Sequence, residues 1–320
     1  MRRKLIRRLL TFVVITAFGM AAFLIGCDLL QAVRSKLVND AVRKLYPAST
    51  LSFFDAIAVS AEAEGYDDVF QESSSDSNEV TAEDVFQISE TPRSEAQTGW
   101  EDADTETVPA PPIHTDFITL YETNPDIVGW LSNEKEIDFP VVQRDNEYYL
   151  DHNFFNHKDS NGTLFLNPVN DVWPKDRILV IHGHAMRSGQ MFGSLRLYKD
   201  EQYVREHPLI DFRTIYEEDK RYYVPIAGFD ASMEPESRFY FDVLRFDFNS
   251  EEEFAAYIDT VLQFSYWHSP VKTDVNDDLL ILITCSYLQT NGRFLLVCRE
   301  LREDETPDEM VRFLNEEAWF

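Results

Sequence analysis

Two short apolar segments near the C-terminus place a cysteine and an arginine where they could do chemistry together. Residues 278–301 read DLLILITCSYLQTNGRFLLVCREL, which predicts two buried strands joined by a short loop. The first strand ends at Cys285 and the second begins at Arg293, so the hairpin sets a thiol across from a guanidinium. We interpret Cys285 as a nucleophile and Arg293 as a fixed cation that stabilises an oxyanion.

A histidine from a distant part of the sequence completes this group. The buried run ILVI is followed by His182, Gly183 and His184, and strand side chains two residues apart point to the same face. We take His184 as the third member. Two histidines at this spacing could also bind a metal, but no neighbouring ligand completes such a site, so we expect neither a metal nor a cofactor.

The chain has three cysteines, Cys27, Cys285 and Cys298, and no pair has metal-type spacing. Cys298 lies in the middle of a strand, where we expect it to pack in the core. An inert buried cysteine is the alternative for Cys285. Its strand-end position and its polar neighbours Thr284 and Ser286 argue against that alternative.

Strands are the main elements that would position these residues. Short apolar runs between turn residues predict six strands before the hairpin, at Ile127–Leu131, Phe139–Gln143, Thr163–Leu166, Ile178–Ile181, Phe212–Tyr216 and Tyr222–Phe229. A helix over 115–124 leads in, and a long amphipathic helix over 250–265 begins with Ser250 as its cap. This pattern favours a mainly β, mostly antiparallel barrel over a doubly wound sheet.

The N-terminal region predicts a membrane anchor. Residues 9–26 form an uncharged apolar run of 18 residues, about the length that crosses the hydrocarbon core of a bilayer. Five basic residues precede the run and favour a cytoplasmic N-terminus. We expect a cytoplasmic tail over 1–8, a single transmembrane helix over 9–29 and an extracellular remainder. A cleaved signal peptide, or a lipoprotein signal ending at Cys27, are the alternatives.

The segment that follows the anchor is acidic. Residues 30–112 contain a juxtamembrane piece and then, from residue 61, a stretch rich in Glu, Asp, Ser and Thr that buries too little apolar surface to fold. We interpret this stretch as a disordered stalk that holds a folded domain, 113–304, off the membrane. Residues 305–320 form an acidic tail with some helical character. The formal charge of −28 excludes nucleic acid as an expected partner.

Several motifs resemble those of class B sortases, the cysteine transpeptidases on the surface of Gram-positive bacteria. The resemblance covers residues 115–302 and includes, in the order of the family, NPDIVGWL (124–131), IDFPVVQRDNEYYL (137–150), NGTLFLNP (161–168), ILVIHGHAMRSGQMFGSL (178–195), SEEEFAAYIDTVLQFS (250–265), LLILITCSY (279–287) and GRFLLV (292–297). It implies a closed eight-stranded β-barrel with an N-terminal membrane anchor. The family's catalytic histidine, cysteine and arginine fall on His184, Cys285 and Arg293.

The resemblance also implies a reaction. Cys285 would attack the carbonyl of a threonine in a C-terminal sorting signal, and an amine of a cell-wall precursor or a pilin would resolve the thioacyl enzyme. Sorting-signal-bearing surface proteins or pilins would therefore be the partners. Val142, Thr284 and Ser286 are expected to line the groove for the sorting peptide.

Three positions depart from the family's usual motifs. Ile281 stands where a threonine usually begins the cysteine signature, His182 replaces a tyrosine, and Ala185 follows the catalytic histidine. The role of His182 stays open. A surface cysteine hydrolase, such as a wall peptidase, and a non-catalytic surface binding module are the alternative functions. The Ser-His-Gly-Cys signature typical of L,D-transpeptidases is absent.

Overall fold

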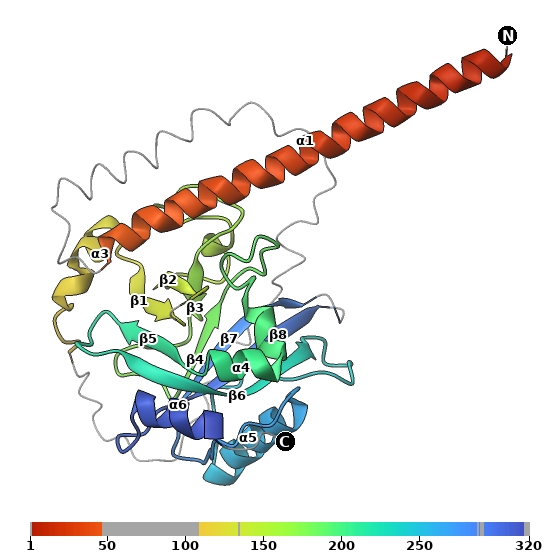
Figure 1. Ribbon diagram of the computed structural model, residues 1–320. Helices are drawn as coiled ribbons and strands as arrows, with labels where there is room; N and C mark the ends of the chain where they lie inside the picture. The colour runs from red at the N-terminus through yellow and green to blue at the C-terminus, as the bar shows by residue number, and fades with distance from the viewer. Residues whose placement is uncertain (1, 47–108, 134, 287, 289–290, 317–320) are drawn as a thin grey trace.

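The computed structural model describes residues 2–46, 109–133, 135–286, 288 and 291–316. Within them, eight strands close into a barrel in the order β1-β2-β3-β4-β7-β8-β6-β5 (Figure 1). The strands are β1 Ile127–Ser132, β2 Asp138–Val142, β3 Leu164–Leu166, β4 Ile178–His182, β5 Ile210–Thr214, β6 Arg221–Ser232, β7 Leu279–Ser286 and β8 Gly292–Glu300. The closed eight-stranded barrel that the resemblance implies is confirmed.

Most neighbouring strands run antiparallel, as the strand spacing predicts. The two parallel pairs are β2 with β3 and β4 with β7. The second of these determines where the candidate residues meet, because it sets the end of β4 beside the end of β7. A parallel pair needs a long crossover connection, and here the chain passes through two α-helices and the strands β5 and β6 before β7 begins.

Helices and 3₁₀ turns surround the barrel. They are α1 Arg2–Leu45, η4 Thr115–Phe117, α3 Ile118–Thr123, η5 Tyr148–Leu150, η6 Leu195–Lys199, α4 Glu201–Glu206, α5 Glu251–Phe264 and α6 Pro307–Glu316. The predicted helix over 250–265 corresponds to α5, where the Ser250 hydroxyl accepts from the Glu253 N–H at 3.3 Å. The predicted helix over 115–124 is split into η4 and α3.

Two apolar clusters form the core. The larger lies in the barrel and under α5, with side chains such as Phe229, Ile258 and Leu282. The smaller lies where η4, α3 and η5 cover one face of the barrel, and it joins Phe117 and Tyr149 to strand residues such as Phe165. This second cluster covers the barrel face next to the candidate active site.

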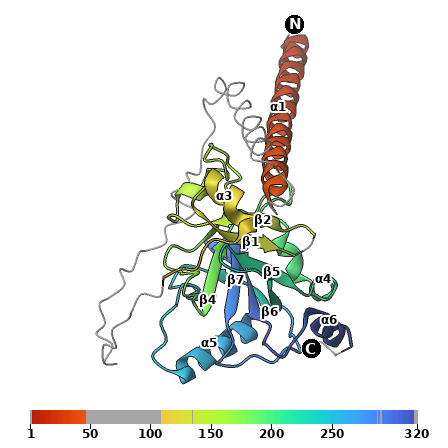
Figure 2. The same ribbon diagram turned by 90° about the vertical axis from the view of Figure 1, so that its left-hand side faces the viewer.

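The last turns of α1 pack on the barrel and belong to the second cluster. Val42 and Leu45 are fully buried, Arg43 Nε lies 2.9 Å from Asp138 Oδ2, and the ring of Tyr46 stacks on Trp130 with centroids 4.4 Å apart. The rest of α1 projects away from the barrel (Figures 1 and 2). In the part of the chain that the structure describes, no helix combines the length and apolar character needed to cross a membrane.

Residues 61–108 of the predicted acidic stalk, 61–112, lie outside the described residues. The residues on either side of the gap nevertheless meet. The rings of Tyr46 and Phe117 lie 5.1 Å apart, and the His114 N–H donates to the Ile215 carbonyl at 2.8 Å. Because the segment begins and ends on the same domain, it does not set the distance between α1 and the barrel.

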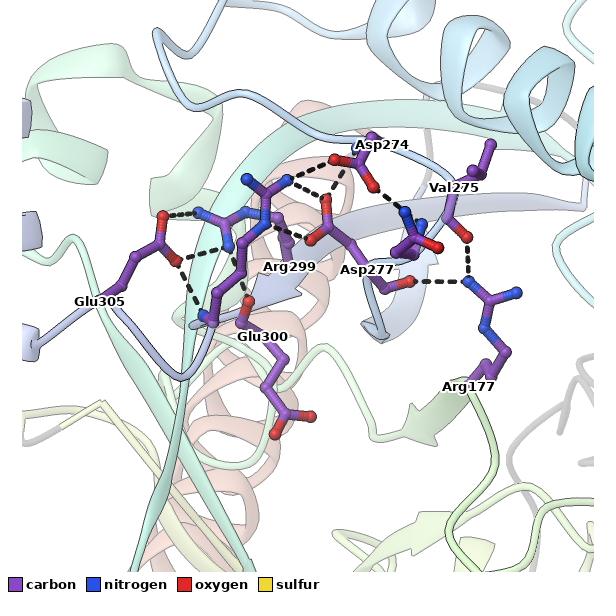
Figure 3. Close-up of polar contacts among 9 residues, drawn as sticks. Arg177, Asp274, Val275, Asp277, Arg299, Glu300 and Glu305 are labelled. Atoms are coloured by element: carbon purple, nitrogen blue, oxygen red, sulfur yellow. Dashed lines mark hydrogen bonds and ion pairs between the residues drawn. The ribbon is translucent and has the colours of Figure 1, made fainter.

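The C-terminal region folds back on the barrel as α6. Met310 and Leu314 join the larger core cluster, and Thr306 and Glu309 form a reciprocal cap at the start of the helix. The turn before α6 is held by ion pairs (Figure 3). Arg299, only 1% exposed, donates to both carboxylate oxygens of Glu305, at 2.7 and 2.9 Å.

Glu305→Gln should weaken this turn. The substitution leaves a buried guanidinium without its counter-ion, which costs up to about 3–5 kcal/mol when a whole partner is removed. We expect a loss of about 2–3 kcal/mol, since glutamine keeps one acceptor oxygen and Glu305 is partly exposed. Urea unfolding of the full chain in detergent measures it. The exposed neighbour Glu303 supplies the control, because Glu303→Gln should change stability by less than about 0.5 kcal/mol.

Candidate active site

Cys285 and Arg293 lie directly opposite each other on β7 and β8. The antiparallel register pairs Cys285 with Arg293 and Thr284 with Phe294. Paired residues share a face of the sheet, so the thiol and the guanidinium project from the same side. Cys285 is partly exposed at the end of its strand, whereas Arg293 is only 6% exposed. The hairpin predicted from the sequence therefore brings the two groups together.

His184 reaches the same place from β4. The parallel register pairs His182 with Ile283, and the pairing continues as the Gly183 N–H donates to the Ile283 carbonyl at 3.2 Å. β4 ends at His182, and His184 follows two residues later. The main chain around His184 thus lies beside the end of β7, although about one hundred positions separate the two segments in the sequence.

A backbone carbonyl fixes the tautomer of His184. Its Nε2 lies 2.8 Å from the carbonyl oxygen of Leu150, at the end of η5. A carbonyl only accepts, so the proton of the neutral ring sits on Nε2 and Nδ1 keeps its lone pair. Tyr149 fixes this segment in turn, since its hydroxyl donates to Asp126 Oδ2 at 2.7 Å. Nδ1 is therefore the ring nitrogen that remains available to exchange a proton.

The resting state pairs a thiol with a neutral imidazole. Burial raises the pKa of the Cys285 thiol, and the positive charge of Arg293 acts in the opposite direction. Burial lowers the pKa of His184, and its bond to the Leu150 carbonyl opposes that shift. With the thiol pKa raised and the imidazole pKa lowered, the thiolate–imidazolium pair is a minor form at neutral pH.

His182 lies one row below the site and is part of the core. It is 2% exposed, its ring stacks on Phe165 with centroids 5.0 Å apart, and the Asn167 side-chain amide lies 3.2 Å from its Nε2. Burial and the nearby charge of Arg293 lower the pKa of His182 to about 3. His182 therefore stays neutral, and its ring is part of the core near Arg293.

The three residues expected to line a peptide groove have different surroundings. Ser286 is partly exposed beside Cys285. Thr284 is buried, and its hydroxyl donates to the Gly183 carbonyl at 2.6 Å, which ties β7 to the chain just before His184. Val142 is fully buried in the second core cluster, in the row of Phe165 and His182. Its side chain forms no part of an open groove in this structure.

The other candidate groups lie apart from the site. Cys298 is fully buried, burial raises its pKa, and both it and Cys285 are free thiols. Among the residues described, no three His, Cys, Asp or Glu side chains come together as a metal site. Sequence reasoning missed the Leu150 carbonyl, because a main-chain acceptor has no sequence signal.

The effect of Arg293 on the thiol can be measured directly. The rate of iodoacetamide alkylation of Cys285 should rise with pH through a pKa above the ordinary thiol value, because only the thiolate reacts. Arg293→Met should move this pKa further upward, since the thiolate loses its neighbouring cation. Mass spectrometry at a series of pH values follows the reaction. Arg312→Met, in α6, is the control and should leave the titration unchanged; an unchanged pKa in Arg293→Met as well would refute the electrostatic role.

The known proteins found to be similar to this chain, in sequence and in fold, are sortase B proteins. Sortase B of Listeria monocytogenes is 36% identical over 104 residues, which are 32% of this chain and 42% of that protein. The chain thus aligns over less than half the length of this curated relative. No family model matches.

Solved structures align over more of the domain. Sortase B of Clostridium perfringens has 28% identity and a TM-score of 0.51, over 57% of this chain and 98% of that one. Sortase B of Staphylococcus aureus, solved as a complex with its substrate, has 23% identity and a TM-score of 0.53, over 60% of this chain and 87% of that one. A sortase B has also been solved with triglycine. Shared sequence and shared fold together place this chain among the class B sortases.

Proposed function

We propose that this chain is a membrane-anchored cysteine transpeptidase that cleaves a C-terminal sorting signal after threonine and joins the protein to an amine. The observation that carries the proposal is the pairing of Cys285 with Arg293 across β7 and β8, with His184 two residues after the end of β4, the strand next to β7. A nucleophile, a proton carrier and an oxyanion stabiliser are the parts that acyl transfer through a covalent intermediate needs.

The first half of the reaction forms the thioacyl enzyme. A proton moves from the Cys285 thiol to Nδ1 of His184, and the thiolate attacks the threonine carbonyl carbon. The carbonyl electrons move onto oxygen, where the Arg293 guanidinium stabilises the negative charge. As the oxyanion collapses, the peptide C–N bond breaks and the departing amine takes the proton from His184.

The second half transfers the acyl group. An incoming amine attacks the thioester carbonyl, gives a proton to Nδ1 of His184, and expels the Cys285 thiolate. The Leu150 carbonyl holds the other ring nitrogen throughout, so the imidazole keeps its orientation between the two halves. The proton then returns to the thiolate and restores the resting pair.

Two sortase B complexes support the choice of substrates. The S. aureus sortase B has been solved with its substrate, and a sortase B has been solved with triglycine, a peptide that offers a free amino group. For this chain we propose a sorting-signal peptide as acyl donor and an amine of a cell-wall precursor or pilin as acceptor.

We also propose that residues 9–29, within α1, span the cell membrane with the N-terminus in the cytoplasm. The apolar run over 9–26 and the basic residues before it support this orientation. The side chains of Phe18, Met20 and Ile25 are 68–78% exposed on α1, which suits contact with lipid. The catalytic domain would then lie outside the cell.

The test is a product analysis with the full chain in detergent. The protein is incubated with a library of pentapeptide signals carrying C-terminal extensions, with and without triglycine, and masses are measured. We expect an acyl adduct on Cys285 and an amide product that requires the amine. Cleavage that is equal with and without the amine, and yields only the free acid, would identify a hydrolase. No adduct from any peptide, with Cys285 inert to thiol reagents, would identify a binding module.

A further inference from the structure

The carbonyl that accepts from His184 Nε2 lies where a loop closes on itself. This carbonyl belongs to Leu150, at the end of η5, and the loop over 151–162 connects η5 to β3. Where the loop returns, the Thr163 N–H donates to the Tyr149 carbonyl at 2.9 Å. The two ends of the loop therefore meet at the short segment that contains the acceptor of the histidine.

Gly162 lies directly against this acceptor. Its φ is +60°, in the left-handed region that favours glycine. A Cβ on Gly162 would lie 2.8 Å from the Leu150 carbonyl oxygen and would overlap the Tyr149 carbonyl oxygen. Both oxygens belong to the main chain, so they cannot turn aside as the end of a long side chain can. Any side chain at position 162 would therefore displace the carbonyl that holds His184.

A buried polar network holds the same segment through the side chain of Tyr149. The Tyr149 hydroxyl donates to Asp126 Oδ2 at 2.7 Å and accepts from the Asn124 side-chain amide at 2.9 Å. The Asn124 amide also donates to the Phe154 carbonyl, inside the loop, at 2.9 Å. Tyr149 and Asn124 are both buried, so a lost partner would leave a buried polar group unsatisfied. The network therefore resists movement of the segment.

The loop also contacts the segment that carries the histidine itself. The Asn161 side-chain amide donates to Gln190 Oε1 at 3.0 Å. Gln190 belongs to the 183–193 loop, in which the Phe192 N–H donates to the His184 carbonyl at 3.0 Å. The imidazole and its acceptor thus lie on two loops that are bonded to each other one residue before the glycine.

We propose, on the basis of the function proposed above, that Gly162 and Tyr149 are positioning residues of the transfer reaction. Together they hold the Leu150 carbonyl against Nε2 of His184, so that the neutral ring carries its proton on Nε2 and keeps Nδ1 free for proton exchange. Neither residue gives or takes a proton in the reaction. Their role differs from general stabilisation of the fold, because it predicts a change of tautomer in a barrel that stays folded.

The bond to the Leu150 carbonyl also affects how readily His184 takes up a proton. Burial lowers the pKa of His184, whereas this bond and the negative charge of Asp151 oppose the shift. Arg293, opposite Cys285, is the cation of the site. If the carbonyl moves away and these charges stay, the pKa of His184 should fall further. The thiolate–imidazolium pair then becomes rarer, and the acid limb of the kcat/KM profile moves to lower pH.

Gly162→Ala tests the role, and Gly189→Ala is its matched control. Gly189 also has a positive φ, +83°, and lies in the 183–193 loop, but a Cβ there would meet no atom within 4 Å. Both variants therefore strain the backbone, and only Gly162→Ala displaces the carbonyl. The full chain in detergent is labelled with 15N in its histidine rings, and NMR reports the tautomer of each ring. A His184→Gln sample assigns the signal. Transfer from a pentapeptide donor to triglycine is measured on the same variants.

We expect Gly162→Ala to show both tautomers of His184 and to lower kcat by roughly 10²-fold, the scale of a small misplacement of a catalytic group. The acid limb should move to lower pH. Gly189→Ala should keep the Nε2–H tautomer, kcat and the pH profile. A single Nε2–H tautomer and an unchanged pH profile in Gly162→Ala would refute the positioning role, even if kcat fell. The tautomer is measured without turnover, so an unmodified chain that transfers nothing would reject the proposed function separately.

Tyr149→Phe tests the same role if Gly162→Ala does not fold. It removes one hydroxyl and keeps the ring in the core, so the segment should move less and kcat should fall by roughly 10-fold. The acid limb should shift in the same direction as in Gly162→Ala. The control is Tyr257→Phe, which removes a buried hydroxyl from α5 in the larger core cluster and should change neither quantity. Identical tautomers and pH profiles in the two tyrosine variants would overturn the proposal.

Discussion

Cys285→Ala should abolish the thioacyl adduct and lower transpeptidation by roughly 10⁴-fold or more, the scale of removing an enzyme's nucleophile. No second thiol of the barrel can replace it, because Cys298 is fully buried within β8 and its pKa is raised. The substitution removes one sulfur from a partly exposed strand end, so the fold should persist. Intact-mass analysis with a peptide donor and triglycine measures both adduct and product.

Two further variants distinguish loss of the nucleophile from a change in the fold. Cys285→Ser keeps the size of the side chain, but a serine hydroxyl ionises far less readily, so this variant should be almost as inactive as Cys285→Ala. Cys298→Ala removes the other barrel thiol and should keep the adduct and the activity. Normal transfer by Cys285→Ala, or loss of the adduct only in Cys298→Ala, would show that Cys285 is not the nucleophile.

The local parts of the site could be predicted from the sequence. A strand hairpin with Cys285 before the loop and Arg293 after it follows from apolar patterning alone, and the β7–β8 register agrees. The convergence of His184 could not be derived in this way. It depends on the parallel pairing of β4 with β7, and no local pattern specifies which distant strands pair; the family motifs supplied that information.

Burial by distant segments is what the sequence could not predict. The resemblance placed Val142 in the groove, but Val142 is fully buried in the core cluster that also contains Tyr149. The predicted juxtamembrane piece carried no sign that Val42 and Leu45 would pack against the barrel. Met310 and Leu314 are among the few apolar residues of an acidic tail, yet they belong to the larger core cluster. In each case, the surface that packs against the segment determines whether its side chains are buried.

Replacing His184 should have the next largest effect on the reaction. His184→Gln keeps an amide N–H that can reach the Leu150 carbonyl but removes the titrating nitrogen. Without a proton donor for the leaving amine and an acceptor for the incoming one, kcat should fall roughly 10²- to 10⁴-fold. His207→Gln is the matched control, since that ring lies outside the site beside Lys135, and it should leave kcat unchanged.

The pH profile distinguishes a proton carrier from a structural histidine. In the wild type, activity requires the thiolate and the imidazolium together, so kcat/KM should be bell-shaped, limited by the lowered pKa of His184 on the acid side and the raised pKa of Cys285 on the alkaline side. In His184→Gln only the thiolate remains to titrate. Residual activity should therefore rise with pH through the thiol pKa and reach a plateau without an alkaline decline. If the bell-shaped pH profile persists in His184→Gln, another group transfers the proton, and His184 is not the acid and base of the reaction.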